Sequence, residues 1–179
     1  MKKKRDRRRA VRETAVIGVS AALCMILSYV EFLLPPIYAA LPAVKPGIAN
    51  VVIVFALYRM SGGRAAILAT IKVLLSALLF GSFVSLAYSA AGAILSLMTM
   101  VIMKRTGLFS SIGVSVSGGV AHNVGQILTA IAILGIPEVA YYLPILLISG
   151  TLSGMLVGFC GGVAVSRIKL DHDSQGKDF

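Results

Sequence analysis

Apolar residues occur along this chain in long runs, separated by short polar or proline-containing connections. Six runs can be marked, at residues 14–34, 46–60, 65–80, 84–103, 109–134 and 143–166. The fourth and sixth have 20 and 24 residues, which is enough to cross a bilayer core of about 30 Å at about 1.5 Å per residue. The second and third, with 15 and 16 residues, are short. The pattern predicts an all-α polytopic membrane bundle of about six transmembrane helices.

Composition supports the membrane class. Hydrophobic residues make up 58% of the 179 residues and charged residues only 13%, against about 25% charged in a typical soluble domain. A soluble fold of this length has too little interior to bury such an excess. We therefore expect a basic cytoplasmic segment at 1–13, a membrane domain at 14–168 and a polar, disordered cytoplasmic tail at 169–179.

The positive charges predict the orientation. Eight of the seventeen Lys and Arg residues lie in the first twelve positions. Directly before an apolar run, such a cluster is typical of a cytoplasmic anchor against anionic lipid headgroups rather than of a nucleic-acid site. With the N-terminus inside, the inner loops and the segment after the last span contain Arg59, Arg64, Lys104, Arg105, Arg167 and Lys169. The outer loops hold only Lys45, so both termini are predicted to be cytoplasmic.

Several kinds of catalytic chemistry lack their motifs in this sequence. No G-x-x-x-x-G-K-[ST] loop is present, which excludes ATP hydrolysis by that route. No Cys/His cluster has metal-ligand spacing. The paired aspartates with which prenyl-transfer enzymes hold magnesium and diphosphate are missing from the membrane domain. We expect no catalytic residues, no cofactor and no metal, and therefore a protein that is not an enzyme.

Seven polar residues lie within or beside the apolar runs, namely Glu31, Lys45, Asn50, Lys72, His122, Asn123 and Gln126. An ionisable group near the centre of a span costs at least about 2.5 kcal/mol, so it is normally paired or functional. The predicted topology places all seven at the midplane or in the outer half. They form a candidate substrate-binding site. The alternative is internal pairing, with Glu31 neutralising Lys72 or Lys45.

Small residues recur at every fourth position in two helices. The last run carries Gly150, Gly154, Gly158 and Gly162, a strip that permits close helix packing. The first run carries Thr14, Gly18 and Ala22 in its cytoplasmic half. This second strip fits the docking of a partner membrane subunit and packing within the monomer equally well.

The stretch Lys45-Pro-Gly-Ile-Ala-Asn50, Glu31 and the run Ala-His-Asn-Val-Gly-Gln at 121–126 resemble the Gx transporter family, also labelled heptaprenyl diphosphate synthase component I. The resemblance covers about residues 12–168. Pro46 stands where that family would have a bulky apolar residue. The family is similar to the substrate-binding S-components of energy-coupling-factor transporters, six-helix proteins that bind a vitamin-like molecule near the outer face.

That resemblance implies a bacterial cell-membrane protein that works with a separate transmembrane coupling subunit and two ATPases. In such S-components, small residues four apart in the first helix contact the coupling subunit, and Thr14, Gly18 and Ala22 match that pattern by position. The synthase label implies a different role, a non-catalytic component of isoprenoid or prenyl-quinone synthesis or of membrane redox chemistry. The expected ligand is a small molecule with a polar or anionic group, facing Lys45, Lys72 and a protonated His122.

Overall fold

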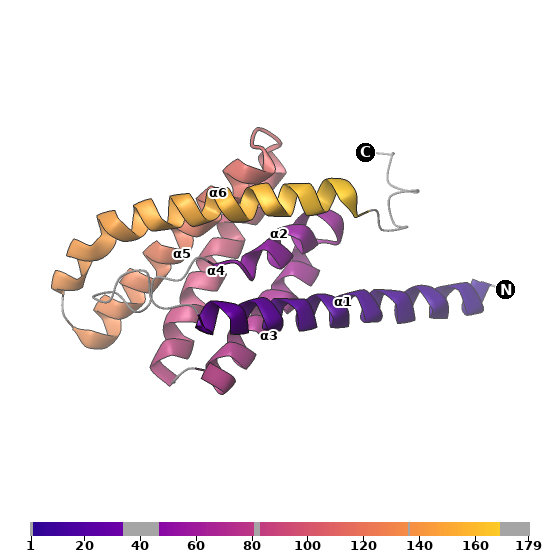
Figure 1. Ribbon diagram of the computed structural model, residues 1–179, viewed down its shortest axis with the longest axis horizontal. Helices are drawn as coiled ribbons and strands as arrows, with labels where there is room; N and C mark the ends of the chain where they lie inside the picture. Colours follow the sequence, from indigo (N-terminus) through magenta and orange to yellow (C-terminus); the bar gives the residue numbers. More distant parts are fainter. Residues whose placement is uncertain (1, 34–46, 81–82, 136, 169–179) are drawn as a thin grey trace.

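The computed structural model is an all-α bundle, as predicted (Figure 1), and it describes residues 2–33, 47–80, 83–135 and 137–168. Within these ranges the helices are α1 (Lys2–Leu33), α2 (Asn50–Arg59), α3 (Gly62–Phe80), α4 (Phe83–Thr106), α5 (Ser111–Leu134), the 3-10 helix η1 (Pro137–Tyr142) and α6 (Leu143–Arg167). Lys45 and the tail at 169–179 lie outside the described residues.

Five of the described helices are long and apolar enough to cross a membrane, which makes the chain a multi-pass membrane protein. The exception is α2, whose 10 residues extend only about 15 Å, half of a bilayer core. The second apolar run is therefore a half-span. The basic segment is not separate, because α1 begins at Lys2. The first seventeen residues contain no Gly or Pro, and Lys and Arg are good helix formers.

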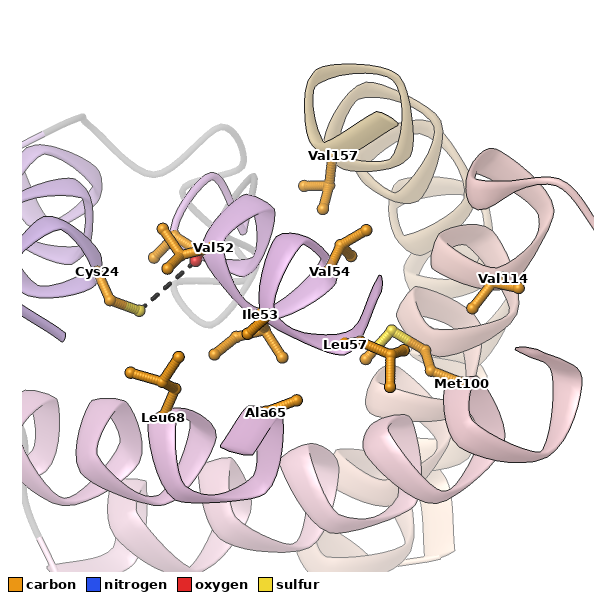
Figure 2. Packing of buried hydrophobic residues seen from close by; sticks show 12 residues of the cluster. Cys24, Val52, Ile53, Val54, Leu57, Ala65, Leu68, Met100, Val114 and Val157 are labelled. Carbon is orange, nitrogen blue, oxygen red and sulfur yellow. Dashed lines mark hydrogen bonds between the residues drawn. The ribbon is translucent and has the colours of Figure 1, made fainter. Parts of the chain in front are cut away.

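The packed core surrounds α2. Its residues from Val52 to Leu57 are all buried, because α2 packs against α1, α3 and α6 at once. A helix that is apolar on every side requires such an enclosed position. Around it lie small and medium side chains from the other helices, among them Leu68, Met100, Val114 and Val157 (Figure 2).

Three basic side chains connect the helices at one end of the bundle. Arg59 donates from Nε to the carbonyl of Val165 in the last turn of α6, at 2.8 Å. Lys104 donates to the carbonyl of Leu57 in α2, at 2.6 Å. The last four carbonyls of a helix have no partner within it and carry its negative dipole end, so these cations stabilise both termini. Arg64 of α3 also pairs with Glu13 of α1, at 2.7 Å.

These three residues all belong to the set predicted to face the cytoplasm, and their hydrogen bonds place them at the same end of the bundle. The first turns of α1 and the last turns of α6 also point toward one side (Figure 1). We call this the clamped end. Which face of the membrane it occupies remains a prediction from the charges.

Helices α5 and α6 approach each other closely through the glycine strip. A Cβ added at Gly154 or Gly158 would lie 2.7 or 2.6 Å from a Cα atom of α5. At Gly150 it would lie 2.9 Å from the carbonyl oxygen of Gly119. Only glycine allows backbones to come this near. The strip therefore packs within the monomer, against α5.

Candidate functional site

A cavity of about 490 Å³ lies in the centre of the bundle and is lined by residues from all six α-helices. Its volume is within the range of about 300–1,000 Å³ typical of small-molecule pockets. Six of the seven predicted polar residues line it, namely Glu31, Asn50, Lys72, His122, Asn123 and Gln126. The fold thus brings together side chains that are up to 95 positions apart in the sequence.

The cavity continues beyond the polar cluster toward the clamped end. On α5 its lining runs from Gln126 to Ser115, a distance of about 16 Å along the helix. The deeper part includes apolar side chains, such as Leu97 and Met100 of α4 and Val157 of α6. The cavity therefore combines a polar region with an apolar extension, which suits a ligand that has a polar group and an apolar body.

Lys72 contacts the beginning of α2. Its Nζ donates to Oδ1 of Asn50 at 2.7 Å, and within the described part of the chain it forms no ion pair with Glu31. An ammonium has three donors and the Asn50 amide nitrogen has two more, so the pair retains N–H groups for a ligand. Gly47, at φ 67°, turns the chain into α2 and would place a Cβ 3.0 Å from Asn50 Nδ2.

The N-terminal end of α2 adds positive electrostatic potential to this region rather than free donors. Its first N–H groups bond to Gly47 and Ile48 carbonyls in a tight turn, and the helix dipole carries a partial positive charge at this end. Gly47 and Asn50 both line the cavity, so this end of α2 faces it. We call Lys72, Asn50 and the start of α2 the donor pole of the cavity.

The opposite character appears on α1 and α3. Glu31 is only 5% exposed, and among the described residues its Oε1 has no hydrogen-bond partner. The buried hydroxyls of Ser28 and Ser76 also lack partners there. Ser28 lies one turn before Glu31 on the same face of α1. Unsatisfied buried polar atoms are rare in native structures, so we expect a ligand to donate hydrogen bonds to these oxygens. We call Glu31, Ser28 and Ser76 the acceptor pole.

The α5 wall contributes His122, Asn123 and Gln126, which have different surroundings. His122 lies against Gly92 of α4, where an added Cβ would be 2.8 Å from its Cε1. Asn123 donates its amide N–H to the Leu146 carbonyl of α6, and the missing side chain at Gly150 gives it room. Asn123 therefore joins α5 to α6, whereas Gln126 lies at the cavity wall with no such bond among the described residues.

Sequence reasoning missed the hydroxyl groups of the cavity. The lining includes Ser28, Ser76, Ser89, Ser96, Ser115, Ser149 and Ser153, together with Tyr88. Serine in a membrane helix usually bonds the carbonyl four residues earlier, as Ser117 does to Gly113, and so gives little functional signal. A usable signal was present: Ser28 is three before Glu31 and Ser76 is four after Lys72, so each shares a helix face with a charge.

The small-residue strip of α1 lies apart from the cavity. Thr14, Gly18 and Ala22 are all exposed, and a Cβ added at Gly18 would meet no atom within 4 Å. Unlike the glycines of α6, Gly18 makes no close contact with another described helix. The strip leaves a flat face along α1 toward its basic end.

Fold and site together define a polytopic α-helical membrane protein with a polar cavity enclosed by its helices. A model of the family described as heptaprenyl diphosphate synthase component I matches residues 21–163, and the chain belongs to this family. Comparison with curated proteins and with solved structures gives no match.

Proposed function

We propose that this chain is the substrate-binding membrane subunit of a small-molecule uptake transporter, energised by separate coupling and ATPase subunits. The central cavity carries the proposal. It has the volume of a ligand site. Its lining gathers charged and polar side chains from several helices. Because such groups are costly inside a membrane domain, their meeting around one cavity favours a binding role. The start of a half-span at its wall is an arrangement that often borders transporter sites.

The proposed substrate has an anionic or hydrogen-bond-accepting group that meets the donor pole. Lys72 and Asn50 retain free N–H groups after bonding to each other, and the α2 dipole favours negative charge at the same place. The apolar extension along Leu97 and Met100 would accommodate the rest of the molecule.

The proposed partner is a transmembrane coupling subunit that docks on the strip of Thr14, Gly18 and Ala22. Two observations support this: the strip is exposed, and the sequence has no ATP-binding loop of its own. A flat face of small residues allows a second helix to approach closely in lipid, where close packing rather than hydrophobicity drives association.

Native mass spectrometry of the full-length protein, gently extracted from its membrane, tests the proposal. The expected spectrum contains a bound small molecule and, in part of the population, ATPase and coupling subunits. A protein without a bound small molecule would contradict the proposal, whether or not it associates with such subunits. Reporters fused after Arg59 and Arg105 should read as cytoplasmic, which would place the clamped end inside and the polar region of the cavity toward the outside.

The family description favours a second candidate, a membrane component of isoprenoid or prenyl-quinone synthesis. Residues 14–168 contain only two acidic residues, Glu31 and Glu138, and so offer no paired aspartates for a magnesium-bound diphosphate. We therefore propose a non-catalytic role in this case as well. Magnesium-dependent prenyl transfer by the purified chain would overturn both proposals, whereas association with a separate prenyl-transfer subunit would favour the second.

A further inference from the structure

From the acceptor pole we infer that the ligand carries a protonated amine, which pairs with Glu31 in the cavity. The inference rests on the proposed function and specifies the substrate class. With an anionic group at the donor pole and a protonated amine at the acceptor pole, the ligand is zwitterionic.

The argument begins with the burial of Glu31. A carboxylate that is only 5% exposed and has an oxygen without a partner among the described residues is costly unless a positive charge or a donor compensates it. The nearest candidate within the wall is Lys72, but its ammonium donates to Asn50. Within the described part of the chain, no cation pairs with Glu31.

The residues around Glu31 indicate which chemical group of a ligand would pair with it. Within the described ranges, the hydroxyl oxygens of Ser28 and Ser76 also lack partners, and both residues line the same cavity as Glu31. One carboxylate with hydroxyl oxygens on neighbouring helices suits an ammonium, which offers three donors and one positive charge. A neutral hydroxyl would supply one donor and would leave the buried charge uncompensated.

Charge balance in the cavity gives the same result. Glu31 and Lys72 contribute one negative and one positive charge to the lining, and they do not pair with each other. A ligand with only an anionic group would compensate the charge of Lys72 and leave Glu31 buried without a counter-charge from the described residues. A zwitterionic ligand would compensate the charges of both Glu31 and Lys72, and the occupied cavity would be electrically neutral.

The isosteric substitution Glu31→Gln tests this pairing, because it keeps the shape of the side chain and removes its charge. Glu13→Gln is the matched control, since Glu13 pairs with Arg64 outside the cavity. In native mass spectra of the full-length protein, the fraction that carries the bound molecule should fall at least about tenfold in Glu31→Gln, the loss expected for a charge-assisted bond. It should stay unchanged in Glu13→Gln.

A second measurement does not depend on how the variant folds. The molecule released from the wild-type protein by acid is treated with dansyl chloride, which labels amines. The expected product is a sulfonamide, formed with release of HCl, whose mass exceeds that of the molecule seen in the native spectrum by one dansyl group less the hydrogen that it replaces. A released molecule without an amine, or a Glu31→Gln protein that keeps it, overturns the inference and leaves the proposed function standing.

Two further outcomes separate the alternatives. If Glu31→Gln lowers the unfolding midpoint of the ligand-free protein but keeps the bound molecule, Glu31 pairs internally and the inference is wrong. If the wild-type protein carries no small molecule at all, the proposed function itself fails, and the inference with it.

Discussion

The two ends of α2 differ in how their polar groups are satisfied. At its C-terminal end, Arg59 and Lys104 bond to backbone carbonyls, and the side chains from Val52 to Leu57 are packed on every side. At its N-terminal end, Asn50 borders a cavity whose acceptor pole lacks partners in the part of the chain that the structure describes. Backbone carbonyls near one end of the helix are satisfied by side chains of the monomer, whereas a carboxylate oxygen beside the other end has no partner among the described residues, which is the distinction expected between a scaffold and a binding site.

The largest expected effect is on the packed side. Gly154→Leu should destabilise the protein by about 3 kcal/mol or abolish folding, because a Cβ at this position would lie 2.7 Å from the Val116 Cα atom and over-packing of this kind is costly. The measurement is the yield of monodisperse protein and its thermal midpoint. A stable Gly154→Leu protein would show that α5 and α6 can separate without loss of the fold.

Lys104→Met should have the next largest effect. It removes the donor of a carbonyl at the end of a buried helix, and leaving such a group unsatisfied costs about 2 kcal/mol. The Tyr58 ring, 5.0 Å from the ammonium, would also lose its cation contact. Thermal unfolding of the ligand-free protein measures the change, and Lys104→Arg should restore most of it. An unchanged midpoint would show that the bond from Lys104 to the Leu57 carbonyl does not stabilise the fold, and the two ends of α2 would then not differ as described.

The same substitution at the cavity should act differently. In Lys72→Met we expect the stability of the ligand-free protein to fall by no more than about 1 kcal/mol, because Asn50 lines the cavity, where water can replace the lost donor. The stabilisation by ligand should disappear. If instead the ligand-free midpoint falls as far as in Lys104→Met, and Glu31→Gln in the same chain partly restores it, Lys72 and Glu31 pair internally.

Gly18→Leu should leave folding unchanged, because the space beside Gly18 is open. Its expected effect is on association, since a leucine would hold a docking helix away from α1. Co-purification of coupling and ATPase subunits should be lost while the bound small molecule is retained. Loss of the folded monomer would show that the strip packs internally, in contrast to its exposed position in this structure.

Much of the candidate site was visible in the sequence because charge is expensive in lipid. Glu31, Lys72 and His122 stand out in apolar runs, and the structure places all three around one cavity. Ser28 and Ser76 did not stand out, since serine is common in membrane helices and can donate its hydroxyl to a backbone carbonyl of its own helix. The sequence also could not show that Asn123 bonds to the α6 backbone, because that bond depends on the spacing between two helices.

The sequence by itself determined the class of protein and the order of its helices. In lipid each backbone N–H and C=O must be satisfied internally, so long apolar runs have to be helices. Only the tertiary structure decided that α2 is an enclosed half-span, that Lys72 bonds to Asn50 rather than to Glu31, and that the glycine strip of α6 faces α5. These features depend on which helix faces meet and how closely, and local sequence patterns do not encode those distances.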